Sequence, residues 1–158
     1  TGYSVTFQEE AVRDMGRTAA GVRGVRLRAD DYVIGAAIIR EGDEVLVITE
    51  KGYGKRTLGS AYPIKGRGGK GIKTANITEK NGPLAGLTTV SGKEDILLIT
   101  DKGIMIRFHA ASVSQTGRAT LGVRLIKMED DAKVITMATV ESEPEVVVEV
   151  EENPIVEE

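Results

Sequence analysis

Three glycine-rich, basic loops contain the residues of this sequence whose types and spacing best suit the binding of an anion. They read GRTAAGVR at residues 16–23, GRGGKGIK at residues 66–73 and GRATLGVR at residues 117–124, and they share the pattern G-R-x-x-x-G-[VI]-[RK]. Glycines allow backbone N–H groups to approach a phosphate closely, and the lysines and arginines supply positive charge. The loops are therefore candidate phosphate-binding sites.

The spacing of these loops indicates an internal repeat. Their first arginines, Arg17, Arg67 and Arg118, are 50 and 51 residues apart. Turn glycines at positions 2, 52 and 103 keep the same interval, and so do related segments that start at residues 32, 83 and 133. Three landmarks in one register predict a repeat of about fifty residues, a length typical of a propeller blade.

Short strands must position the loops. The runs DEVLVIT at residues 43–49 and EDILLIT at residues 94–100 are apolar and rich in β-branched residues, which predicts strands buried on both faces. Each run is followed by a Lys-Gly turn and a second strand, at residues 53–58 and 104–109, which predicts hairpins with a left-handed glycine in the turn. Residues 9–14 are the one candidate helical turn.

The predicted fold is all-β, with propeller-like blades of four-stranded antiparallel sheet, and it is partial. We place a DNA-binding domain at residues 1–140, with repeats at about 1–30, 31–81, 82–131 and 132–140. These amount to two complete repeats plus partial ones. So few blades cannot close a ring, so we expect the chain to be the end of a larger propeller, or else to self-associate through its open side.

The charge of the chain is divided between a basic body and an acidic tail. Residues 141–158 contain eight of the 24 acidic side chains and none of the 21 basic ones, so residues 1–140 carry a net charge of +5, against −3 for the whole chain. A basic body is typical of a domain that binds a polyanion. The tail is predicted to be disordered, and it either competes with phosphates for the basic residues or only keeps the chain soluble.

Cations that return at the same phase of successive repeats gather on one surface, whereas any single one is more simply a solvated side chain. We therefore predict a curved row of phosphate contacts that binds and bends duplex DNA without reading its base sequence. Strand residues beside the loops are expected to extend the row. The predicted DNA-binding residues are Arg17, Arg23, Lys55, Arg56, Lys65, Arg67, Lys70, Lys73, Arg107, Arg118 and Arg124.

The sequence predicts no catalytic residue and no metal site. It has no cysteine and one histidine, His109, which excludes thiolate and histidine-cluster metal sites and makes a catalytic triad improbable. The segment GRGGKG at residues 66–71 matches a dinucleotide fingerprint, but no helical pattern follows it, and Gly71 stands where a Walker A loop has Ser or Thr. Aromatic residues are too few for a platform that stacks single strands. No apolar run reaches the ~18 residues of a membrane span, and the lack of cysteine fits the cytoplasm.

The phrases VLVITEKGYGKRT, YPIKGRGGKGIKT and DMGRTAAGVRGVRL closely resemble the C-terminal domain of bacterial DNA gyrase A, which belongs to a type IIA topoisomerase. The resemblance implies a β-pinwheel, usually of six blades that exchange a strand between neighbours, of which this chain is the last third to half. It implies that duplex DNA is wrapped around a basic perimeter so that the ATP-dependent enzyme introduces negative supercoils. It also implies two partners in an A2B2 assembly, gyrase B and the rest of gyrase A, in the cytoplasm near the bacterial nucleoid. ATP and magnesium belong to other parts of that enzyme, so no cofactor is expected in this chain.

The chain departs from the gyrase pattern at two adjacent positions. The hallmark box of the family reads Q-[RK]-R-G-G-[RK]-G, whereas residues 65–71 read KGRGGKG, with Lys65 in place of Gln and Gly66 in place of a basic residue. This segment resembles a degenerate copy of the box in a later blade. The corresponding C-terminal domain of topoisomerase IV is the related alternative, and a protein-binding β-propeller is the alternative from another class. Only phosphate binding should weaken steeply as salt rises.

Overall fold

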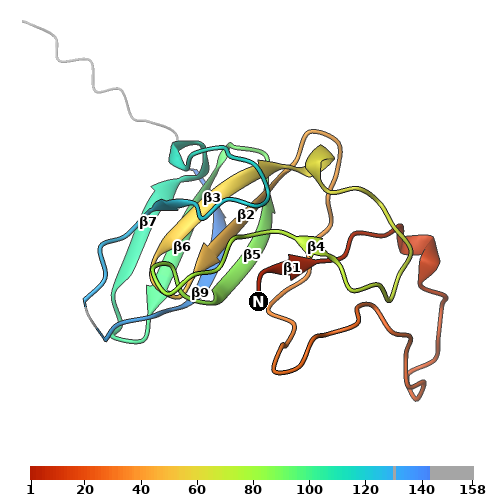
Figure 1. Ribbon diagram of the computed structural model, residues 1–158. Helices are drawn as coiled ribbons and strands as arrows, with labels where there is room; N and C mark the ends of the chain where they lie inside the picture. Colours follow the sequence, from red (N-terminus) through yellow and green to blue (C-terminus); the bar gives the residue numbers. More distant parts are fainter. Residues whose placement is uncertain (130, 143–158) are drawn as a thin grey trace, which may run out of the picture.

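The computed structural model describes residues 1–129 and 131–142, and within them it confirms an all-β fold (Figure 1). Short 3-10 helices are the helical segments of this described part, and one of them falls within the predicted helical turn at residues 9–14. The elements in chain order are β1 (Tyr3–Ser4), η1 (Glu9–Ala11), β2 (Glu44–Thr49), β3 (Tyr53–Leu58), η2 (Gly59–Ala61), β4 (Ile72–Lys73), β5 (Leu84–Val90), β6 (Glu94–Thr100), β7 (Met105–His109), η3 (Ala110–Ser112), β8 (Val123–Arg124) and β9 (Val134–Glu141).

The strands form one complete four-stranded blade and parts of two others. The complete blade is antiparallel and has the order β5-β2-β3-β8, whereas the neighbouring sheet has the order β7-β6-β9 and the smallest sheet pairs β1 with β4. The predicted hairpins are present as β2–β3 and β6–β7. Their turn glycines, Gly52 and Gly103, have φ angles of 77° and 78°, which is the left-handed conformation that the sequence predicts.

The outer strand of a blade comes from the following repeat. β8, which ends the loop at residues 117–124, pairs with β3 through Tyr53↔Arg124 and Gly54↔Val123. One repeat earlier, β4 ends the loop at residues 66–73 and pairs with β1 in the same register, Tyr3↔Lys73. Strand exchange between neighbouring repeats, which the resemblance implies, is therefore present twice in this molecule.

Strand β2 lies at the centre of the core, since all six of its residues are buried. Leu46 and Ile48 pack with Ile96 and Leu98 of β6, while Val45 and Val47 pack on the opposite face of β2. The prediction of burial on both faces is thus confirmed for β2. In β6 it is wrong for one face: Ile96 and Leu98 are buried, but the alternate positions are only half-buried. The half-buried face of β6 has no sheet packed over it among the described residues, whereas β2 has apolar neighbours on both sides.

Residues 12–43 cross the molecule without forming a strand. The third landmark of the repeat forms β5 and β9 in its second and third copies, but its first copy, near residues 32–42, is irregular. There the apolar side chains of Tyr32, Val33 and Ile38 are more than half exposed. A cleft of about 350 Å³ lies between β1 and this segment, at the place that β2 occupies between β3 and β5. Because β5 becomes a strand by pairing with β2, the open cleft accounts for the irregular first copy.

Strand β9 ends the described chain and reaches Glu141, one residue past the predicted limit of the basic body. The acidic tail from residue 143 onward, with its predicted disorder, lies outside the described residues. Among residues 1–129 and 131–142, no helix has the length and apolar character needed to cross a bilayer.

Candidate nucleic-acid interface

The three basic loops are built in the same way around a left-handed glycine. Gly21, Gly71 and Gly122 have φ angles of 82°, 78° and 86°. A Cβ atom at Gly71 would lie 2.5 Å from the carbonyl oxygen of Ser4, and one at Gly122 would lie 2.7 Å from that of Gly54. Glycine is therefore required at the second and third loops both for its conformation and for the close approach of the next backbone.

The first arginine of each of these two loops ties its loop to the preceding one. The guanidinium of Arg67 donates to the carbonyl of Arg23 at 2.6 Å, and the guanidinium of Arg118 donates to the carbonyl of Lys73 at 2.8 Å. In both cases the acceptor is the last residue of the preceding loop. The three loops thus lie next to one another in series, as the repeat predicts. Because the guanidinium groups of Arg67 and Arg118 bind backbone carbonyls, the neighbouring basic side chains are the ones available to a ligand.

Several of the predicted cations are exposed on these loops. Arg17, Arg23, Lys65 and Lys70 are exposed, and no ion pair or side-chain hydrogen bond is recorded for them within residues 1–129 and 131–142. Lys73 is half-buried and donates to the side-chain oxygen of Asn76 at 3.3 Å. Arg124 is exposed but donates to the hydroxyl of Tyr53 at 3.0 Å and lies over its ring.

Lys55 corrects the expectation that the adjacent strand extends the row. Its residue is only 1% exposed, and its ammonium donates to the carbonyls of Gly117 (2.7 Å) and Arg118 and to the hydroxyl of Thr120 (3.2 Å). Burial, followed by the charge of Arg118, lowers the pKa of Lys55 to about 8. Lys55 therefore holds the third loop in place from within, and its ammonium is not available to a phosphate.

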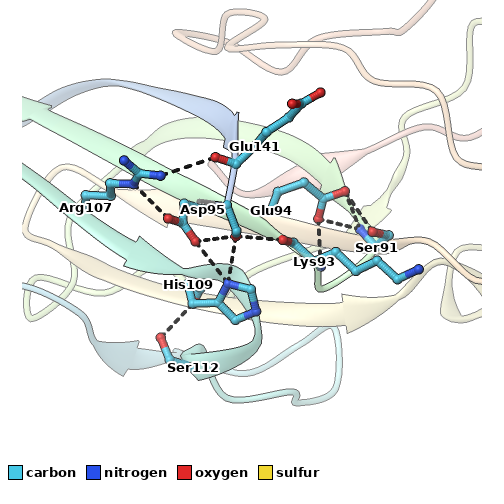
Figure 2. A network of polar contacts seen from close by, with 9 residues as sticks. Ser91, Lys93, Glu94, Asp95, Arg107, His109, Ser112 and Glu141 are labelled. Atoms are coloured by element: carbon cyan, nitrogen blue, oxygen red, sulfur yellow. Dashed lines mark hydrogen bonds and ion pairs between the residues drawn. The ribbon is translucent and has the colours of Figure 1, made fainter. Parts of the chain in front are cut away.

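Arg56 and Arg107 also have structural partners, and these partners repeat. Arg56 is paired with Glu44 and donates to the carbonyl of Val113 at 2.8 Å. One repeat later, Arg107 is paired with Asp95 at 2.7 Å (Figure 2). Each pair joins diagonal positions of a hairpin, where opposite charges attract across strands. The acid twelve residues before each arginine is the sequence signal for this structural role.

The Asp95 carboxylate also contacts Ser142, the residue that follows β9. It accepts hydrogen bonds from the Ser142 hydroxyl at 2.6 Å and lies 3.0 Å from Nδ1 of His109 (Figure 2 shows the surrounding network). The hydrogen bonds from Ser142, His109 and Arg107 lower the pKa of Asp95 to about 2. His109 is thus a structural residue at the end of β7.

Two exposed cations belong to the loops although the sequence pattern did not single them out. Arg26 and Lys127 occupy equivalent positions, three residues after the last basic residue of the first and third loops. Both side chains are exposed, and the backbone N–H of Arg26 donates to Gly69 of the second loop at 2.8 Å. The repeat register contains the sequence signal for these two cations, because GVRGVR at residues 21–26 aligns with GVRLIK at residues 122–127. Within the part of the chain that the structure describes, no cluster of three acidic or histidine side chains could hold a metal ion.

Comparison with known families and proteins gives consistent results. The family model of the DNA gyrase C-terminal domain, a β-propeller, matches residues 1–40, 43–91 and 94–141. DNA gyrase A of Staphylococcus aureus strain NCTC 8325 is 50% identical over 143 residues, which cover 89% of this chain and 16% of that protein. The same protein from strain MRSA252 is 50% identical over 141 residues, covering 88% of this chain and 16% of the relative. The chain thus spans about a sixth of the length of these curated relatives.

Solved structures share the fold. A DNA gyrase A C-terminal domain superposes with a TM-score of 0.82 at 25% identity, over 87% of this chain and 47% of that one. The C-terminal domain of a DNA topoisomerase IV superposes with a TM-score of 0.83 at 24% identity, over 89% of this chain and 44% of the other. The second likeness concerns the fold alone.

Proposed function

Because the chain belongs to the family of DNA gyrase C-terminal domains, we propose that it binds and bends duplex DNA along its three basic loops, without preference for base sequence. The observation that carries this proposal is the serial connection of the loops, in which Arg67 and Arg118 each bind the end of the loop before. This connection brings the exposed cations of successive repeats next to one another. Neighbouring cations neutralise successive phosphates, and backbone contacts of this kind carry no base readout.

The partners and the reaction follow from the same membership. The chain acts as part of a type II topoisomerase, together with gyrase B and the rest of gyrase A in an A2B2 enzyme that introduces negative supercoils. ATP hydrolysis and magnesium binding occur elsewhere in that enzyme, and this part contributes DNA wrapping and no catalytic residue. Its place is the bacterial cytoplasm, at the nucleoid. Topoisomerase IV is the alternative enzyme, and the 50% identity to DNA gyrase A favours gyrase.

The proposal is tested by removing one exposed charge and leaving the scaffold intact. Lys70→Gln removes a cation of the second loop, and Lys93→Gln is the matched control in the turn between β5 and β6. Fluorescence anisotropy with two duplexes of unrelated sequence should show weaker binding by Lys70→Gln to both duplexes, and unchanged binding by Lys93→Gln. Equal binding by the two variants would exclude the second loop as a phosphate contact. Binding of proteins in preference to DNA would instead favour the other class of propeller.

A further inference from the structure

The third loop differs from the second in the basic side chains of its turn. Lys65 and Lys70 of the second loop are exposed, whereas the repeat places Thr116 and Leu121 at the equivalent positions of the third. The remaining cation of the third turn is Arg118, and its guanidinium is bound to a carbonyl of the second loop. Residues 116–121 therefore contain no basic side chain without a partner.

The cation of this repeat lies beneath the loop instead. Lys55 of β3 is 1% exposed, and its ammonium donates to the carbonyls of Gly117 and Arg118. The repeat places Val5 at the equivalent position beneath the second loop, where a Cβ on Gly71 would lie 3.2 Å from the Val5 side chain. The second loop thus carries its positive charge on its surface, and the third carries it on its underside.

The carbonyl groups of the third loop point towards this underside. Those of residues 116–118 accept hydrogen bonds from the Thr57 hydroxyl and the Lys55 ammonium, two side chains on the same face of β3. The carbonyls of residues 120–121 are bound by donors of the segment at residues 76–81. All peptide bonds of the described residues are trans, so the N–H group that follows each of these carbonyls points the opposite way.

Three consecutive N–H groups, those of Gly117, Arg118 and Ala119, are therefore directed to the outer side of the loop. None of the three donates a hydrogen bond within residues 1–129 and 131–142. Gly117 and Ala119 are exposed, and their small size leaves the backbone accessible. Residues 113–127 contain no acidic side chain. Adjacent backbone N–H groups of one orientation form a concave site that binds anions.

We propose that the third loop binds one phosphate of duplex DNA through the N–H groups of residues 117–119, and that Lys55 is the positioning residue that keeps these groups outward and supplies positive charge from beneath. The inference rests on the DNA binding proposed above and assigns the atoms that make the contact. A backbone N–H that donates to a phosphate makes a charge-assisted hydrogen bond, which is about twice as strong as a neutral one.

The protonation of Lys55 then couples DNA binding to pH. Burial, followed by the charge of Arg118, lowers the pKa of Lys55 to about 8. The other titratable groups on this face of the blade are Arg124, Tyr53 and Tyr62, none of which is a carboxyl group, and burial raises the pKa of Tyr62. A bound phosphate favours the charged ammonium and so raises the pKa of Lys55 in the complex. Affinity should therefore be constant below about pH 8 and fall as the pH rises above it.

The first test needs no substitution. Backbone amide signals of the isotope-labelled 158-residue chain are followed by NMR while a short duplex DNA is added. The amide protons of residues 117–119 should shift downfield, as expected of groups that donate to a phosphate. Shifts confined to the first two loops would overturn the inference and leave the proposed DNA binding intact. A duplex that shifts no signal of any loop would overturn both.

A pair of variants tests the role of Lys55. Lys55→Met removes the ammonium and keeps an apolar stem, and Lys93→Met is the matched control, which removes the same charge from the exposed turn between β5 and β6. Lys55→Met should bind a duplex about tenfold more weakly than Lys93→Met at about pH 7, since one hydrogen-bonded charged contact is lost. Circular dichroism verifies that both variants are folded.

The pH profile separates this role from a merely structural one. Between about pH 8 and about pH 9.5 the wild-type chain and Lys93→Met should lose affinity, whereas Lys55→Met should show a flat profile. A folded Lys55→Met that binds as tightly as Lys93→Met, or that shares its pH profile, would overturn the inference. If Lys55→Met does not fold, the wild-type profile decides, because unchanged wild-type affinity above about pH 8 is equally incompatible with it.

Discussion

Replacing Arg56 by methionine separates a structural cation from a DNA-binding one. Methionine keeps much of the length of the side chain and removes the guanidinium. In the folded protein this guanidinium pairs with Glu44 and donates to the carbonyls of Val113 and Ala111. Arg107→Met is the matched control, because the same pair recurs one repeat later with Asp95.

The expected magnitudes differ because the two pairs differ in exposure. The side chains of Arg56 and Glu44 are 14% and 10% exposed, so the substitution leaves the nearly buried carboxylate of Glu44 without its partner. Removing one partner of a buried pair costs about 3–5 kcal/mol, which corresponds to a fall in Tm of about 6–20 °C for a chain of this size. Arg107 is 38% exposed, so solvent screens its pair with Asp95, and Arg107→Met should destabilise the protein less than Arg56→Met does.

Urea unfolding followed by circular dichroism gives both free energies, and a double variant Glu44→Leu/Arg56→Met should recover part of the loss. DNA binding by the folded variants provides the second measurement. A structural Arg56 leaves the salt dependence unchanged, whereas loss of a phosphate contact would lower the slope of log K against log salt by about 0.9. A structural role of Arg56 is excluded if Arg56→Met destabilises the protein no more than Arg107→Met, or if the salt slope of Arg56→Met falls by a full contact.

Three further predictions concern a loop glycine, an acid and the tail. Gly122→Ala should lower the free energy of unfolding in a urea titration by more than about 1 kcal/mol, because the φ of Gly122 is 86° and an added Cβ would lie 2.7 Å from the Gly54 carbonyl oxygen. Gly117→Ala is the control: Gly117 has open surroundings, so the free energy of unfolding should hardly change. The pKa of Asp95, lowered from 3.8 to about 2, gives a stabilisation that is complete above pH 3.8 and is lost as the pH falls towards 2, and NMR titration of its carboxyl should show the lowered midpoint. Removal of residues 143–158, which carry seven glutamates, should tighten DNA binding if the tail competes with phosphates, and equal affinity of the two chains in anisotropy would assign it a solubilising role.

Local sequence patterns were sufficient for the strands of the two hairpins. Residues 43–49, 53–58, 94–100 and 104–109 contain β2, β3, β6 and β7 to within a residue at each end, because apolar runs and Lys-Gly turns act over short distances. The two-residue strands β4 and β8 were recognised only as loop landmarks. They become strands by pairing with a neighbouring repeat, and such pairing depends on tertiary structure.

The serial arrangement of the three loops was predictable from the repeat, whereas the burial of individual cations was not. The repeat register placed the three loops side by side, and the hydrogen bonds of Arg67 and Arg118 agree with that arrangement. Counting cations alone could not distinguish Lys55, which the blade buries beneath the third loop, from Lys70, which is exposed. Burial is a property of the assembled blade, so it could not be read from the positive charges.

The salt dependence of duplex DNA binding measures how many phosphates the basic loops contact. Six exposed cations on or beside the three loops, Arg17, Arg23, Arg26, Lys65, Lys70 and Lys127, would give a slope of log K against log salt of about −5.4, equivalent to about an 1,800-fold loss of affinity between about 50 and 200 mM salt. Binding along the loops should give a slope near this value, equal for duplexes of unrelated sequence. A slope near zero, or binding restricted to one sequence, would contradict it.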